Sequence, residues 1–272
     1  MSLSYVSSLR NPLLKEYIKL QRSRRYRHKT KKIALEGPNL VSEAIQAGLT
    51  PQAVFFTQRY FDQAGKGWLT DLPPAVKQLV LPPALFNEIA DTETPRPVAA
   101  IFYFSEADNN QEAKSLLKLV LILDRLRDPG NMGTIIRTAA AVGADIVYYT
   151  AGSVDPFSPK VLRATAGSIF HIKVKQAADP LVLIKELKKS GLQSVAASAK
   201  SAGNYWSLDF RQPTALIVGN EAGGVAEKLL AESDNTVSIP LCGRVESLNA
   251  AVASAVVLYE IIRQRSEQKP CR

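Results

Sequence analysis

Three short segments in the second half of the chain place polar side chains and glycines directly after apolar runs. In the first, residues 124–138, Asn131 follows Pro-Gly and Arg137 comes six residues later. A helix that begins at such a turn presents free N–H groups to an anion, and an added arginine suits phosphate. The segment predicts an anion-binding turn, with Asn131 capping the helix and Arg137 facing the same mouth. A plain capped turn with Arg137 on the surface is the alternative.

The second segment, residues 219–224, reads Gly-Asn-Glu-Ala-Gly-Gly. Its glycines permit a close backbone approach to a ligand or turns with positive φ. Glu221 could bind a ribose hydroxyl or an amine, or it could cap the next helix. The spacing is GxExxG rather than the GxGxxG of dinucleotide-binding folds, which disfavours a nicotinamide-dependent oxidoreductase.

The third segment, residues 239–253, begins Ile-Pro-Leu-Cys-Gly-Arg-Val-Glu-Ser-Leu-Asn. Pro240 and Gly243 shape a tight passage, and Ser247 and Asn249 stand at the predicted start of a helix rich in small residues. Ser247 could be an ordinary helix cap. Alternatively, it could take part in the site that the other two segments indicate.

The elements that must position these segments alternate between strands and helices. In the second half, we expect strands at residues 119–123, 146–149, 169–174, 194–197, 215–218 and 237–239, and helices at 131–142, 180–189 and 247–263. Alternation of this kind predicts a mostly parallel α/β sheet, which binds ligands at the carboxyl ends of its strands. The three segments lie at such ends.

The first half reads as a smaller α/β domain that begins with a helix at Asn11 and Pro12. Its other expected elements are strands at residues 33–36, 53–57, 78–81 and 98–104, and helices at 39–47 and 83–90. We predict a domain over residues 1–106, a polar linker over residues 107–115 and a second domain over residues 116–272.

The net charge of +9 is concentrated in residues 10–32. This segment has ten basic residues and one acid, Glu16, and the remaining residues balance at 24 basic and 24 acidic. Clustered cations gain affinity for polyanions by releasing counterions, and interleaved aromatic rings can stack on bases. The segment therefore predicts RNA binding, for which the candidate contacts are Arg22, Arg24, Arg25, Arg27 and Lys29. A solvated basic helix remains an alternative. A transit peptide is disfavoured because the segment continues into the expected strand at residues 33–36.

Composition excludes several other classes of protein. No apolar run reaches the roughly 18 residues of a membrane span, and the first ten residues lack an apolar signal core. Two cysteines are too few for a disulfide framework, which indicates a reducing, cytoplasmic setting. With only two histidines, we expect no metal site.

Taken together, the three segments resemble the signature motifs of the SpoU (TrmH-type) RNA 2′-O-ribose methyltransferases of the SPOUT superfamily. The resemblance rests on N-x5-R, GxExxG and IPLxGxxESLN, in this order. The stretches at residues 8–12 and 35–44 are also similar to the family's N-terminal substrate-binding domain. One departure is Ala222, where many relatives have glycine; because Gly224 is kept, we expect cofactor binding to be retained.

The resemblance implies an S-adenosylmethionine-dependent enzyme whose C-terminal parallel sheet contains a SPOUT-type trefoil (α/β) knot. It also implies a homodimer and a ribosomal RNA substrate, since the N-terminal domain is similar to that of ribosomal-RNA-directed relatives. A transfer RNA 2′-O-methyltransferase and a non-catalytic RNA-binding module are the alternatives. Carried over by motif, the cofactor pocket is Val218, Gly219, Ile239, Leu241 and Leu248. The catalytic set is Asn131, Arg137, Glu221, Ser247 and Asn249.

Overall fold

The computed structural model describes residues 3–64, 68–92, 94–104 and 117–266, and its chain divides into two compact units. The first unit comprises Met1–Ser105 together with Phe157–Phe170, and the second comprises Glu106–Pro156 and His171–Arg272. No pattern in the sequence indicated that Phe157–Phe170 would belong with the N-terminal part. The linker expected at residues 107–115 lies outside the described residues.

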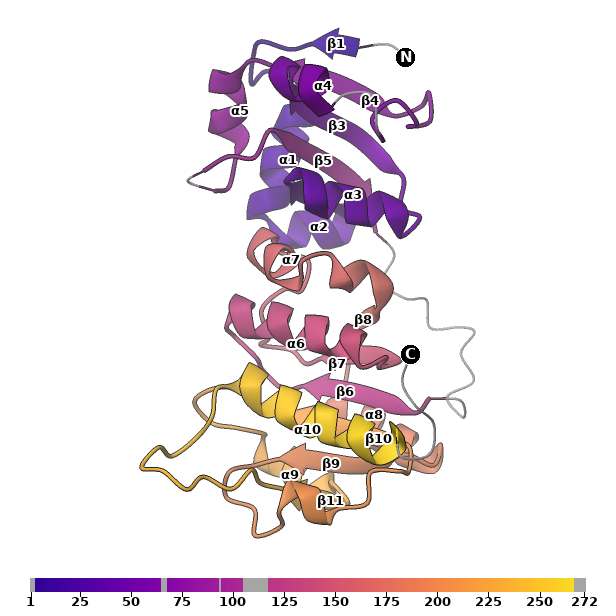
Figure 1. Cartoon of the computed structure of the whole chain (residues 1–272), viewed down its shortest axis with the longest axis vertical. Helices are drawn as coiled ribbons and strands as arrows, with labels where there is room; N and C mark the ends of the chain where they lie inside the picture. The colour runs from indigo at the N-terminus through magenta and orange to yellow at the C-terminus, as the bar shows by residue number, and fades with distance from the viewer. Residues whose placement is uncertain (1–2, 65–67, 93, 105–116, 267–272) are drawn as a thin grey trace. The chain divides into compact units, whose positions relative to one another are not determined.

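A mixed five-stranded sheet forms the centre of the first unit, in the order β1-β4-β3-β5-β2 (Figure 1). Strands β1, β4 and β3 are parallel, whereas β5 is antiparallel to both β3 and β2. Consequently β2 runs in the same direction as β1, β3 and β4. The strands are β1 (Leu3–Tyr5), β2 (Lys32–Glu36), β3 (Pro51–Thr57), β4 (Lys77–Leu81) and β5 (Val98–Tyr103).

Six α-helices belong to the described part of this unit. The basic segment forms two of them rather than one, because Ser23 ends α1 and its side chain accepts a hydrogen bond from the Tyr26 N–H at 3.2 Å to cap α2. Asn11 caps α1, as the Asn-Pro pair predicted. The helices are α1 (Pro12–Arg22), α2 (Arg24–Thr30), α3 (Pro38–Gln46), α4 (Gln58–Ala64), α5 (Pro83–Ile89) and α7 (Pro159–Thr165).

The second unit contains an all-parallel six-stranded sheet in the order β11-β9-β10-β6-β7-β8. Its two central strands, β6 and β10, are buried along their whole length, as the solidly apolar sequence of residues 119–123 predicted for β6. The parallel α/β fold is thereby confirmed, while the knot stays a prediction from the resemblance. The strands are β6 (Leu119–Leu123), β7 (Ile146–Tyr149), β8 (Lys173–Gln176), β9 (Gln193–Ala197), β10 (Thr214–Val218) and β11 (Asn235–Val237).

Helices cover both faces of this parallel sheet. On one face, Leu183 and Leu187 of α8 (Pro180–Lys189) and Leu229 of α9 (Glu227–Glu232) pack against alternate residues of β6 and β10. On the other face, α6 (Pro129–Ala141) and α10 (Ala250–Ser266) contact each other (Figure 1). Because both faces are covered, the open edge for a ligand is the one at the strand ends.

Several sequence-based boundaries differ from the structure. The strand expected at residues 169–174 is instead a 3-10 helix (Ser168–His171) followed by β8, because this stretch crosses between the two units. The helix expected from residue 247 begins at Ala250, and the one expected from residue 131 begins at Pro129. No helix among the described residues is long and apolar enough to cross a membrane.

Candidate active site at the carboxyl ends of the parallel strands

The loops that follow β6, β7, β10 and β11 meet at one edge of the parallel sheet. They do so because parallel strands end at the same edge, and the three sequence motifs lie on these loops or on the helix that follows. Four strands that are distant in sequence therefore contribute to one set of polar contacts.

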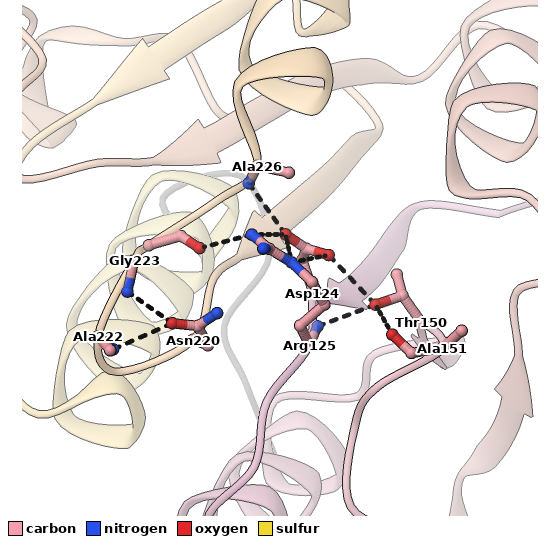
Figure 2. A network of polar contacts seen from close by, with 9 residues as sticks. Asp124, Arg125, Thr150, Ala151, Asn220, Ala222, Gly223 and Ala226 are labelled. Atoms are coloured by element: carbon pink, nitrogen blue, oxygen red, sulfur yellow. Dashed lines mark hydrogen bonds and ion pairs between the residues drawn. The ribbon is translucent and has the colours of Figure 1, made fainter.

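A buried carboxylate, Asp124, joins three of these loops (Figure 2). It directly follows β6 and is 3% exposed. Its oxygens accept hydrogen bonds from the Thr150 hydroxyl at 3.1 Å, after β7, and from the Ala226 N–H at 2.9 Å, after β10. It also forms an ion pair with Arg125 at 3.0 Å. Since a buried charge is tolerated only when it is paired and hydrogen-bonded, this network ties the loops together.

Arg125 is held in the left-handed region of backbone conformation, with φ at 53°. Its N–H donates to the Thr150 hydroxyl at 2.8 Å, and its guanidinium donates to the Gly224 carbonyl at 3.4 Å (Figure 2). A non-glycine residue adopts this conformation at a cost, which the surrounding contacts must offset. Arg125 therefore links the end of β6 to the glycine-rich loop.

The glycine-rich loop closes on itself. Asn220 and Gly224 exchange backbone hydrogen bonds of 3.3 and 3.0 Å. The Asn220 side-chain oxygen also accepts from the N–H groups of Ala222 and Gly223 (Figure 2). A Cβ atom on Gly219 would lie 1.9 Å from the Gly224 carbonyl carbon. Glycine is thus required at position 219 for the closure of the loop itself, whatever ligand it binds.

A chain of side-chain hydrogen bonds connects the three motifs. Asn131 donates from Nδ2 to Glu221 Oε1 at 2.8 Å, and its Oδ1 accepts from Asn249 Nδ2 at 2.8 Å. Asn131 is free to do this because Asp128, rather than Asn131, caps α6, accepting from the Asn131 N–H at 2.7 Å. The expectation that Asn131 caps the helix is therefore wrong.

Asn249 has a second role at the start of α10. Its Oδ1 accepts a hydrogen bond from the Ala251 N–H at 2.8 Å, so Asn249 caps this helix and Ser247 does not. The Asn249 side chain therefore both caps α10 and contacts Asn131 of the first motif. The start of α10 is fixed relative to α6 as a result.

Arg137 and Ser247 do not join this hydrogen-bonded chain. Both are exposed. Six residues separate Arg137 from Asn131, which puts their side chains about 120° apart around the axis of α6. That Arg137 faces the same mouth as Asn131 therefore stays a prediction.

The expected cofactor residues range from buried to exposed. Val218 and Gly219 are buried at the end of β10, Ile239 and Leu241 are half-buried, and Leu248 is exposed. Within the described chain, the backbone groups of residues 239–248 make no hydrogen bonds to other backbone groups. Free N–H and C=O groups beside apolar side chains suit an adenine ring, which is read at its polar edge and packed on its face. The residues present therefore fit a nucleoside-containing cofactor.

Sequence reasoning missed Asp124, Asp128, Thr150 and Asn220. Asp124 did carry a signal, because it is the first polar residue after a fully apolar strand. Its partners stand 26 and 102 residues away, and only the fold shows that they meet. Across the described residues, no group of histidine, cysteine, aspartate and glutamate is placed to hold a metal ion.

The basic segment of the first unit is mostly exposed, with one exception. Arg22, Arg24, Arg25 and Lys29 are exposed, whereas Arg27 is only 4% exposed. The Arg27 guanidinium donates to the backbone carbonyls of residues 20 and 21, at 2.6 and 3.1 Å. Arg27 thus ties α2 to the end of α1, and its selection as an RNA contact is corrected on this ground.

Comparison with known proteins places this geometry in context. Residues 118–259 match the SpoU rRNA Methylase family, and residues 11–100 match an MRM3-like substrate binding domain. The chain is 34% identical to the 23S rRNA (guanosine(2553)-2′-O)-methyltransferase RlmP of Bacillus subtilis, covering 94% of this chain and 98% of that protein.

Two solved structures have the same fold over nearly the whole chain. An AdoMet-bound rRNA methyltransferase from Sinorhizobium meliloti superposes with a TM-score of 0.81 at 30% identity, covering 96% of this chain and 98% of that one. The SpoU methyltransferase AviRb from Streptomyces viridochromogenes, in complex with AdoMet, gives a TM-score of 0.84 at 28% identity, covering 94% and 98%.

Proposed function

Because the chain belongs to the SpoU rRNA Methylase family, whose members are S-adenosylmethionine-dependent RNA 2′-O-ribose methyltransferases, we propose that it methylates a ribose 2′-hydroxyl of ribosomal RNA. The observation that carries this proposal is the hydrogen-bonded chain from Glu221 through Asn131 to Asn249. It brings the three family motifs to one edge of the sheet. The ribosomal target is supported by RlmP, a 23S rRNA methyltransferase that matches over both units.

The reaction requires little covalent help from the protein. The cofactor supplies a methyl group already activated on a sulfonium, and the protein must hold the 2′-oxygen in line with it and accept a proton. Asn131 has both ends of its amide occupied, so it acts as a positioning residue for Glu221. One Glu221 oxygen accepts from Asn131, which leaves the other to accept a hydrogen bond from the ribose hydroxyl.

Arg137 has a different role, in keeping with its exposed place on α6. A guanidinium does not deprotonate in proteins, so Arg137 does not remove the hydroxyl proton. We assign it to the phosphate next to the target ribose and to the negative charge that develops on the 2′-oxygen. Ser247, exposed in the loop before α10, is assigned to the RNA backbone at the same edge.

RNA capture is assigned to the first unit and methyl transfer to the second. Ten of the chain's basic residues lie within residues 10–32, and Arg22, Arg24, Arg25 and Lys29 expose their side chains there. No family motif for the cofactor lies in this unit. A protein with few cysteines and an RNA substrate fits the cytoplasm, which we propose as its compartment.

A homodimer is supported by an apolar stripe on α10. Val252 and Tyr259 are 50% and 57% exposed, and Ala255, Val256 and Ile262 between and beyond them are half-buried. Their spacing of three, four and seven residues places them on one face of the helix. A second copy of the chain would cover this face, which a monomer leaves in water. Sedimentation of the protein as a monomer at micromolar concentration would contradict this assignment.

Mapping of 2′-O-methylated nucleotides tests the proposed function directly. Ribosomal and transfer RNA from cells with and without the gene should differ at one ribosomal nucleotide, and purified protein with S-adenosylmethionine should restore that methyl group. A missing methyl group in transfer RNA alone would reassign the substrate. Unchanged methylation in both RNAs, with no transfer in vitro, would count against the activity itself.

A further inference from the structure

A pocket of about 400 Å³ opens in the first unit, where its parallel strands end. β1, β4 and β3 lie side by side in the sheet (Figure 1). Their last residues and the following turns line the pocket. The lining is mainly apolar and includes Val80, Leu81 and Pro82, with Tyr5, Gln58 and Arg59 among its polar members. Its size lies within the range of pockets that hold small ligands.

This pocket is distinct from the basic segment in the same unit. The basic helices α1 and α2 lead into the start of β2, whereas the pocket lies at the ends of strands that run in the same direction as β2. β2 and β1 are also the two opposite edge strands of the sheet. The pocket and the basic helix α2 therefore lie at opposite ends of the strands and near opposite edges of the sheet.

Tyr5 presents an exposed ring that is nevertheless held in place. The side chain is 72% exposed, yet its hydroxyl donates to Gln58 Oε1 at 3.0 Å. Gln58 in turn donates from Nε2 to Asp62 at 2.8 Å. The backbone beyond Tyr5 is also fixed, because the Val6 N–H donates to the Val80 carbonyl at 3.0 Å. An exposed aromatic ring with a fixed orientation loses little freedom when a flat ligand stacks on it.

The charge at this pocket favours an anionic ligand. Arg59 is exposed, and within the described chain it has no hydrogen-bond or ion-pair partner. No acidic side chain of the described residues lines the pocket, and the nearby Asp62 is engaged by Gln58. A fixed ring, an apolar wall and an uncommitted guanidinium match the base and the phosphate of one nucleotide.

We propose that this pocket binds an unpaired nucleotide of the RNA substrate, with the base stacked on Tyr5 and its phosphate on Arg59. The proposal rests on the proposed function, because it takes RNA as the ligand of the first unit. Gln58 is a positioning residue that orients the Tyr5 ring. The pocket would select RNA with a splayed-out base, whereas the basic segment attracts any phosphate backbone.

The test uses the full-length protein and a 12-nucleotide single-stranded RNA carrying one 2-aminopurine, with the matching duplex as a second probe. Tyr5→Ala should weaken single-strand binding by about 5- to 100-fold, as loss of one base–aromatic stack does, and should remove the quenching of 2-aminopurine fluorescence. Duplex binding should change little, because its bases are already stacked. Tyr5→Phe should retain the quenching, and Arg59→Ser should lower the salt slope for the single strand by about 0.7.

Trp206→Ala is the matched control, because Trp206 is an exposed aromatic residue of the second unit. It should leave single-strand affinity unchanged. Equal RNA affinity and equal quenching in Tyr5→Ala and wild type would overturn the pocket assignment. A change in sedimentation of Tyr5→Ala without a change in RNA binding would also overturn it, because that result indicates a contact between proteins. Methyl transfer by the wild type to ribosomal RNA is measured in parallel. Its presence in any of these cases would leave the proposed function standing.

Discussion

The two units differ in what lies at the carboxyl ends of their parallel strands. In the second unit, the loops there are cross-linked by side-chain hydrogen bonds, such as Asp124 to Ala226 and Asn249 to Asn131, which join residues 102 and 118 positions apart. In the first unit, the corresponding edge carries an open pocket with the exposed side chains of Tyr5 and Arg59.

This difference fits the roles that we propose for the two edges. Methyl transfer in line with a 2′-oxygen requires atoms fixed to within a fraction of an ångström, and buried hydrogen-bonded networks supply that rigidity. Binding of a polyanion requires accessible charge and rings, which act at longer range and tolerate adjustment. Substitutions in the second unit should therefore act by changing the geometry of the loops. Those in the first unit should change the affinity for RNA and its dependence on salt.

The largest effect is expected at the centre of the loop network. Asp124→Ala leaves the Thr150 hydroxyl, the Ala226 N–H and the Arg125 guanidinium without their shared acceptor. Loss of one partner of a buried charge network costs about 3–5 kcal/mol, so thermal unfolding of the second unit should occur at a lower temperature. Calorimetry should also show no binding of S-adenosylhomocysteine. Asp124→Asn keeps the shape of the side chain, so its melting temperature should lie between those of the wild type and Asp124→Ala. An unchanged melting temperature in Asp124→Ala would refute the role of this network.

Arg137→Ala should separate chemistry from cofactor binding. Removal of a charge that stabilises a developing oxyanion lowers kcat by about 100- to 1000-fold. Because Arg137 is exposed and outside the loop network, the melting temperature and S-adenosylhomocysteine affinity should match those of the wild type. Thr134→Ala, another exposed position on α6, is the control. Transfer by Arg137→Ala at the wild-type rate would remove this residue from the mechanism.

Two glycines of one loop provide a matched pair. Gly219→Ala places a methyl group 1.9 Å from backbone carbon, so the Asn220–Gly224 closure must open. Such overpacking costs about 1–3 kcal/mol, and cofactor affinity should fall by roughly ten- to a hundredfold. Gly223→Ala meets only the Asn220 side chain, at 3.6 Å, and should be tolerated. Equal affinity in the two variants would show that loop closure does not support the cofactor site.

The smallest effect per residue is expected in the basic segment. Replacing Arg22, Arg24 and Arg25 with serine should lower the salt slope of RNA binding by roughly 0.7–0.9 for each lost phosphate contact, with unchanged S-adenosylhomocysteine affinity. Arg27→Ser is the contrasting variant, because its guanidinium is buried against the carbonyls of residues 20 and 21. It should lower the stability of the first unit. A wild-type salt slope in the triple variant would mean that the charge is only a solvated face.

Much of the fold was predictable because hydrophobic patterns are local. The solidly apolar β6, the strand β10 and the Asn-Pro start of α1 were all identified from sequence. β1, α4, α7 and α9 were missed, and each has at most seven residues, too few to establish a period by itself. The 3-10 helix at Ser168–His171 was misread as a strand because its apolar Ile169 is buried without belonging to a sheet.

The site divides in the same way. The sequence by itself determined that Asn131, Glu221 and Asn249 belong to one site, because their motifs follow strands whose parallel order brings the ends together. Only the tertiary structure decided that Asp124 joins the loops and that Arg27 is buried. The physical reason is that residue type and spacing fix what a side chain can bond. Its burial and partners depend on which distant segments the packed sheet places beside it.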